Sequence, residues 1–173
     1  SASTSNPSLR GHRPPGAPAA ARPLLNHRVS TLLANPVIPM KSVPTIQRYM
    51  STSPHAIGAD QSLRAASELM RQHGIRHLPV MRDDRVAGIL SERDVALISG
   101  LGDVDPDKVL VADAMTSDVI TVGPDAPLDE VATLMAERRA GSVVVEQNHR
   151  LVGIFTTVDA LTAFAELLHS RLK

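Results

Sequence analysis

Apolar residues recur at helical spacing in two segments of the chain. The first segment places Leu63, Ala66, Leu69 and Met70 on one side of a helix, and the second does the same with Leu128, Val131, Leu134 and Met135. Asp60 and Asp125 precede these stripes and are good N-cap residues, while Gly74 and Gly141 follow them as stop signals. The pattern therefore predicts two amphipathic helices with these four residues at their ends.

Short alternating or continuous apolar runs predict strands on both sides of each helix. Brief strands around Ala56-Ile57 and across 119–122 precede the helices, and two hairpins follow them, with strands at 77–81, 85–90, 142–146 and 151–155. Asp83-Asp84 and Asn148-His149 are the predicted hairpin turns. A helix is expected to begin at Ser91 and another at Thr156.

The C-terminal helix carries an apolar face made of Leu161, Phe164, Ala165, Leu168 and Leu172. This face is larger than one small repeat needs. Two interpretations stay open: it packs on its own sheet, or it contacts a second copy of the chain.

The chain is a tandem duplication. Shifting it by 65 residues aligns positions 46–98 with 111–163 without a gap, and eleven positions are identical. Because a unit of this size has a thin core, the two copies are expected to pack on each other. The predicted fold is α/β (α+β): two β-α-β-β-α repeats related by pseudo-twofold symmetry, spanning 43–104 and 105–173.

Charge and composition separate the first part of the chain from the repeats. Residues 1–59 hold six basic and no acidic residues, whereas 60–173 hold twelve basic and eighteen acidic ones. Residues 1–42, rich in Pro, Ala and Ser, are interpreted as a flexible basic extension. A targeting leader, an artificial leader added for expression and a weak nucleic-acid arm are its alternatives.

Several classes of function find little support in the composition. No apolar run is long enough to cross a membrane, and the absence of cysteine agrees with a cytoplasmic location. Three aromatic residues in all argue against nucleic-acid binding by stacking. The sequence lacks a phosphate loop, a metal-ligand cluster and a nucleophile with its base, so we expect no enzyme, no metal and no catalytic cofactor.

Ser91-x-x-Asp94 and Thr156-x-x-Asp159 occupy the same place in both repeats, each after an apolar strand. The simplest explanation is a capping box, in which hydroxyl and carboxylate satisfy amides at the helix start. A second explanation is a ligand site. A helix N-terminus attracts anions, and a carboxylate one turn further can accept the hydroxyls of a ribose.

The repeated GILSERD and GIFTTVD elements, within the two aligned halves, resemble a cystathionine-β-synthase (CBS) domain pair, or Bateman module. The resemblance covers about 43–168, and the whole chain is similar to small stand-alone bacterial CBS-pair proteins, including relatives of an acetoin-utilisation protein. It implies a regulatory module that binds adenosine-containing molecules, such as AMP, ADP, ATP or S-adenosylmethionine, in clefts between the repeats. It also implies a homodimer that signals to an effector protein.

Site residues follow from the resemblance position by position. Asp94 and Asp159 would hold ribose hydroxyls, and Ser91 and Thr156 would contact phosphate or ribose. The adenine base would lie against strand residues: Ile57, Leu78, Pro79, Val80, Val122, Val143, Val144 and Val145. Arg76, His77, Arg93, Arg138 and Arg139 are the candidate phosphate partners, and since Val158 and Ser142 replace Arg93 and His77, the two clefts should differ in affinity. The alternative is a structural or interaction protein with empty clefts, whose basic tail touches nucleic acid.

Overall fold

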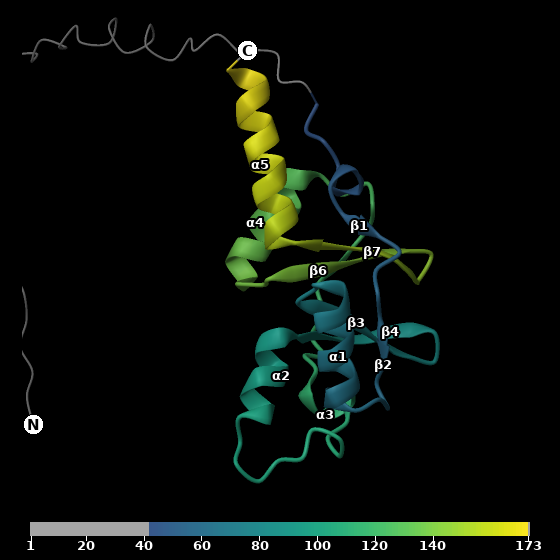
Figure 1. Cartoon of the computed structure of the whole chain (residues 1–173). Coiled ribbons are helices and arrows are strands. Elements are labelled where there is room, and N and C mark those ends of the chain that lie inside the picture. The colour runs from purple at the N-terminus through teal and green to yellow at the C-terminus, as the bar shows by residue number, and fades with distance from the viewer. Residues whose placement is uncertain (1–41, 173) are drawn as a thin grey trace, which may run out of the picture. The chain divides into compact units, whose positions relative to one another are not determined.

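A computed structural model describes residues 42–172, and the predicted extension lies almost entirely outside them. The described part contains both repeats (Figure 1). Its elements are η1 (Ile46–Arg48), β1 (Ser51–Thr52), β2 (Ile57–Gly58), α1 (Leu63–His73), β3 (His77–Arg82), β4 (Arg85–Ser91), α2 (Glu92–Ser99), α3 (Val111–Ala114), β5 (Thr121–Val122), α4 (Leu128–Arg138), β6 (Ser142–Gln147), β7 (Arg150–Thr156) and α5 (Thr157–Arg171).

The two amphipathic helices form as predicted, but they begin two residues later than expected. Ser62 is the N-cap of α1, where its hydroxyl accepts a hydrogen bond from the Ala65 amide at 3.2 Å, and Pro127 precedes α4. The prediction of Asp60 as N-cap is wrong because that residue lies in a turn, closed by the Gln61 amide donating to the Gly58 carbonyl at 3.2 Å. The same shift makes the prediction of Asp125 wrong.

The two helices end in the same way with different residues. Gly74 ends α1 in the left-handed conformation, with φ 62°, as its lack of a Cβ allows. At the equivalent place α4 ends at Arg139, with φ 52°, so Gly141 is not the stop that was predicted. In both repeats the next amide closes the helix end: Ile75 donates to Met70 and Ala140 to Met135.

The hairpins have identical registers in the two repeats, which the duplication requires. His77 pairs with Ser91 and Ser142 pairs with Thr156, and the register of each hairpin shifts at the same point. Their turns are Asp83-Asp84 and Asn148-His149, and all four residues have positive φ, as a tight turn between twisted strands demands. Figure 1 shows the two hairpins stacked, with α4 and α5 above one and α2 and α3 below the other.

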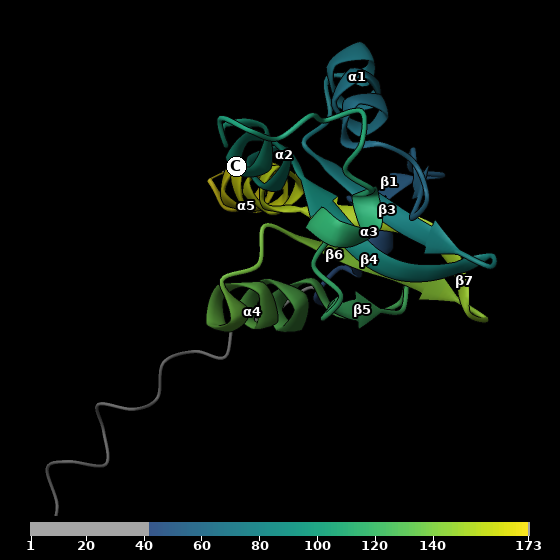
Figure 2. The same cartoon turned by 90° about the horizontal axis from the view of Figure 1, so that it is seen from below.

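The first segment of each repeat crosses to the sheet of the other repeat. Strand β1, near the start of the first repeat, pairs with β7, so that Ser51 lies opposite Ile154. Reciprocally, Thr116, near the start of the second repeat, bridges Ile89 of β4. The cores follow this exchange: Ile46 packs in the cluster of the second repeat, and Val111 of α3 packs in that of the first. The view from below shows α3 beside β4 (Figure 2).

The face of α5 opposite its core contact is exposed. Ala163 is fully buried, whereas Leu161, Phe164 and Leu172 keep 67%, 59% and 84% of their surface. The interpretation that this apolar face packs on its own sheet is therefore wrong. Among residues 42–172, no helix is both long and apolar enough to cross a membrane.

The exchange between repeats gives a stability prediction at Gly153, on which the incoming segment packs. A Cβ there would lie 2.7 Å from the Met50 sulfur and 3.1 Å from the Ser51 carbonyl oxygen. Overpacking of this kind costs about 1–3 kcal/mol, so Gly153→Ala should lower the free energy of unfolding by that amount in urea denaturation. Gly123→Ala is the control, because a Cβ there meets nothing within 4 Å. Equal losses in both variants would contradict the account of the exchange.

Candidate functional site

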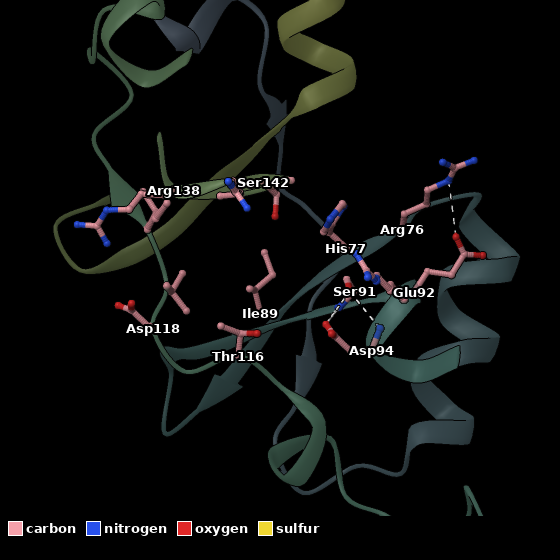
Figure 3. Close-up of a pocket in the computed structure, with 16 residues that line it drawn as sticks. Arg76, His77, Ile89, Ser91, Glu92, Asp94, Thr116, Asp118, Arg138 and Ser142 are labelled. Atoms are coloured by element: carbon pink, nitrogen blue, oxygen red, sulfur yellow. Dashed lines mark hydrogen bonds and ion pairs between the residues drawn. The ribbon is translucent and has the colours of Figure 1, made fainter. Parts of the chain in front are cut away.

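A cavity of about 680 Å³ lies where the two repeats meet, and both repeats supply its walls (Figure 3). The first repeat contributes the end of β4 and the start of α2, and the second contributes the segment before β5 and the turn between α4 and β6. The volume is in the range of small-molecule sites. The lining residues are Arg76, His77, Ile89, Ser91, Glu92, Arg93, Asp94, Thr116, Asp118, Val119, Ile120, Arg138, Arg139, Ala140, Gly141 and Ser142.

At the edge of this cavity Ser91 and Asp94 form a complete capping box. The Asp94 amide donates to the Ser91 hydroxyl oxygen at 3.2 Å, and Asp94 Oδ2 accepts from the Ser91 amide at 3.0 Å and from the Ser91 hydroxyl at 2.6 Å. Over residues 42–172, the hydrogen bonds of the Asp94 carboxylate involve only its Oδ2. The cap therefore leaves Oδ1 available to accept a hydrogen bond from a ligand.

The start of α2 offers fewer free amides than a bare helix N-terminus. The Glu92 amide donates to the Arg76 carbonyl at 2.9 Å, and the Asp94 amide is used by the cap. The start of α2 is thus a weaker anion site than the sequence pattern predicts. Any anion in the cavity would depend mainly on cationic side chains.

The second motif has the same cap in a different setting. Thr156 and Asp159 repeat the box, with Asp159 Oδ2 accepting from the Thr156 amide at 2.7 Å and from its hydroxyl at 2.8 Å. Neither residue lines the cavity. Their role as ligand contacts stays a prediction.

His77 and four arginines line the cavity, and nearby acidic groups balance the charges of these arginines to different extents. Arg76 Nε lies 3.6 Å from Glu92 Oε2, and Figure 3 shows Arg138 and Asp118 across the cavity from this pair. Burial lowers the pKa of His77, and Arg76 lowers it further, although the charges of Asp94 and Glu92 oppose the shift. His77 is therefore neutral in the folded chain at neutral pH.

The apolar strand residues predicted to hold a base are mostly core residues. Ile57, Leu78 and Val80 are buried in the first cluster, Val143 and Val145 in the second, and Val122 packs against the second. Val144 and Pro79 are also fully buried. None of these eight lines the cavity, and their contact with an adenine base stays a prediction.

Residues of the first segment of the second repeat were not predicted as site residues. Thr116, Asp118, Val119 and Ile120 reach the cavity because their segment crosses to β4. Their positions correspond to 51–55 in the 65-residue alignment, which carries no sign of the exchange. Over residues 42–172, no three His, Asp or Glu side chains gather in a way that could hold a metal ion.

The CBS domain model matches residues 46–99 and 111–166, more than half of the chain and both repeats. The chain belongs to the CBS domain family. Its two matches coincide with the repeats found by the 65-residue shift, so the resemblance of the GILSERD and GIFTTVD elements is confirmed, as is the mixed α/β architecture of paired CBS repeats.

In two curated relatives the matched region makes up very different shares of the protein. Hypoxic response protein 1 of Mycobacterium tuberculosis is 31% identical over 116 residues, which cover 66% of this chain and 81% of the relative. Inosine-5′-monophosphate dehydrogenase of Korarchaeum cryptofilum is 32% identical over 120 residues, 69% of this chain but 24% of the relative. The similarity to the dehydrogenase thus covers a minor part of an enzyme.

A similar solved structure was determined with ligands bound. The CBS domain pair of protein MJ0100, in complex with 5′-methylthioadenosine and S-adenosyl-L-methionine, is 27% identical to this CBS pair. The match covers 72% of this chain and 98% of the other, with a TM-score of 0.65.

The lowered pKa of His77 predicts a specific acid sensitivity. In the unfolded chain its pKa returns to about 6.5, so the unfolded state binds a proton that the folded state does not. The stability contributed by neutral His77 is present above that value and is lost as the pH falls towards the lowered pKa. His77→Gln should remove part of the loss in melting temperature between about pH 7.5 and about pH 5.5.

His149→Gln, at the exposed turn between β6 and β7, is the control and should keep the full loss. An unchanged acid sensitivity in His77→Gln would show that its burial does not determine the effect.

Proposed function

We propose that the chain is a regulatory module that senses an adenosine-containing molecule in the cavity between its CBS repeats. One observation carries the proposal: a cavity of suitable volume is walled by both repeats and has the Asp94 carboxylate at its edge, with Oδ1 outside the cap. Asp94 would accept ribose hydroxyls there, with Ser91 beside it. Binding rather than catalysis is proposed.

The similarity to the CBS pair of MJ0100 supports the class of ligand. That protein was solved with two adenosine derivatives, and its likeness to this chain spans nearly its whole CBS pair. The part of the cavity at Asp94 suits the sugar that all adenosine compounds share. The nature of the remaining part of the ligand depends on the other walls.

The binding of a ligand in this cavity would depend on how the two repeats pack against each other. Because Ser91 and Asp94 belong to one repeat and Gly141 and Ser142 to the other, the bound molecule contacts both at once. A ligand that binds one relative arrangement better than another shifts the population towards it, and a few kcal/mol of differential affinity suffice. An effector protein that recognises one arrangement would receive the signal.

Ligand binding is tested by thermal denaturation with adenosine, 5′-methylthioadenosine, S-adenosylmethionine, AMP, ADP, ATP and NAD. A ligand at one hundred times its dissociation constant should stabilise the chain by about 2.7 kcal/mol. Asp94→Asn should abolish the shift, because its single oxygen would serve the cap and the NH2 group in the place of Oδ1 donates hydrogen bonds and cannot accept them from ribose hydroxyls. Flat curves across the panel would favour the interaction protein with an empty cleft.

Asp159→Asn is the matched control, since it perturbs the same cap outside the cavity. Binding at the cavity should survive in this variant. A second binding event lost only with Asp159→Asn would support the proposed site at Thr156 and Asp159. Retained affinity in Asp94→Asn would refute the assignment at the first motif.

We also propose that two copies of the chain associate through α5. With about 100° per residue, Leu161, Phe164 and Leu168 lie on the side of the helix away from buried Ala163. An apolar stripe along one helix can pack on the same stripe of a second copy across a twofold axis.

Multi-angle light scattering tests this association. The double variant Leu161→Glu with Phe164→Glu should convert a dimer to a monomer, because it places charges in an apolar contact. Thr162→Glu adds charge to an exposed polar position of the same helix and should leave the dimer intact. A monomeric parent chain at micromolar concentration would rule out the contact.

A further inference from the structure

Two methionines lie at the points where the chain crosses between the repeats. Met50 directly precedes β1, and its sulfur is 2.7 Å from the place that a Cβ of Gly153 in β7 would take. Met115 directly precedes Thr116 and lies in the same way on Gly88 of β4. Each packs against the core of the repeat to which it does not belong, Met50 against the second cluster and Met115 against the first. Both therefore hold a crossing segment on the opposite sheet.

The duplication has kept methionine at both crossing points. Met50 and Met115 are equivalent under the 65-residue shift, and so are the glycines on which they lie, Gly153 and Gly88. An unbranched thioether can fill the gap over a residue that lacks a Cβ, which accounts for the apolar part of this pairing. Cores also tolerate leucine in place of methionine, but only methionine brings a sulfur atom that can be oxidised.

The methionines of residues 42–172 differ in their access to solvent. Met70 and Met135 keep only 4% and 3% of their surface, whereas Met50, Met81 and Met115 are partly exposed. Because the chain contains no cysteine, thioethers are its only sulfur groups. A dissolved oxidant therefore reaches the methionines of the crossing segments before those inside the two cores.

We infer that Met50 and Met115 are modification sites, at which a peroxide oxidises the thioether to a sulfoxide and loosens the exchange between the repeats. The sulfur lone pair attacks one peroxide oxygen, so that an S–O bond forms and the O–O bond breaks. The sulfur gives up two electrons, and hydrogen peroxide is reduced to water. This modification does not depend on the ligand proposed above.

The surroundings of both sulfurs are unsuited to a sulfoxide. The oxidised side chain is polar, and its oxygen needs a hydrogen-bond donor. A backbone carbonyl oxygen faces each place instead: that of Thr116 is 3.0 Å from a Cβ of Gly88, and that of Ser51 is 3.1 Å from a Cβ of Gly153. The amides of Ile89 and Thr116 already donate to each other's carbonyl oxygens, both at 2.9 Å. The oxidised side chains should therefore leave these places.

The two sites differ in their distance from the cavity. Thr116, which follows Met115, lines the cavity, and so does Ile89, to which it is bridged. Oxidation of Met115 should therefore loosen a wall of the cavity. Met50 instead holds β1 on β7, and neither strand lines the cavity. Its oxidation should weaken the pairing of these strands.

Treatment of the full chain with hydrogen peroxide, followed by peptide mass mapping and urea denaturation, tests the inference. Met50 and Met115 should oxidise at least about tenfold faster than Met70 and Met135. The oxidised chain should unfold at a urea concentration lower by about 1 M, because a polar group has entered an apolar contact. Equal oxidation rates at all four residues, or an unchanged urea midpoint after full oxidation of Met50 and Met115, would overturn the inference.

Replacement by leucine separates these two sulfurs from the others. The double variant Met50→Leu with Met115→Leu should keep its urea midpoint after peroxide treatment, because leucine has no sulfur to oxidise. Met81→Leu is the matched control: Met81 is partly exposed and, among residues 42–172, belongs to neither core cluster. This control should lose as much as the parent chain. An equal loss in the double variant would place the effect elsewhere and refute the assignment.

Hydrogen exchange on the parent chain gives a second test that needs no variant. After peroxide treatment the amides of Ile89 and Thr116 should exchange faster, because their mutual hydrogen bonds open more often. Reduction by the two methionine sulfoxide reductases, one for each sulfoxide epimer, should restore slow exchange. Exchange that is unchanged when Met115 is oxidised, or that stays fast after its reduction, would contradict the inference.

Discussion

The reciprocal exchange of the first segments of the two repeats is the constraint on which the rest of the structure depends. Each repeat is too small to bury a large core by itself, and each receives apolar residues from the first segment of the other. The pairing of β1 with β7 and the bridge between Ile89 and Thr116 fix these segments on the opposite sheets. The cavity is a direct consequence, because the segment at Thr116–Ile120 is one of its walls.

The hydroxyl and carboxylate of the repeated motif have a structural role whether or not a ligand binds. Both motifs form full capping boxes, which explains why the same spacing occurs twice after an apolar strand. This role uses Oδ2 of Asp94 and does not compete with a ligand at Oδ1. The choice between cap and ligand site was therefore a false alternative at Asp94, where one side chain can serve both.

The duplication repeated the backbone more faithfully than the charges. Hairpin registers, the ends of α1 and α4 and the two capping boxes agree between the repeats, whereas the charged residues at the cavity have largely uncharged counterparts. Backbone hydrogen bonding and core packing restrict the registers, helix ends and capping boxes in both repeats. Exposed side chains are free of those restrictions, so the two repeats can differ there without loss of fold.

The sequence by itself determined the four longer helices, the two hairpins, the duplication and the family, because these follow from local periodicity, turn residues and a repeated motif, whereas η1, β1 and α3 were not predicted. The hairpin turns at positive φ and the helix starts at Ser91 and Thr156 were predictable for this reason. The exact ends of helices were less predictable, since Asp60 and Ser62 are both good N-cap residues and only the turn geometry selects one of them. The tertiary structure alone decided which residues meet at the cavity. Segments that exchange between repeats leave no local signal, and the placement of Arg138, Arg139 and Asp94 around one cavity depends on contacts between residues more than forty positions apart.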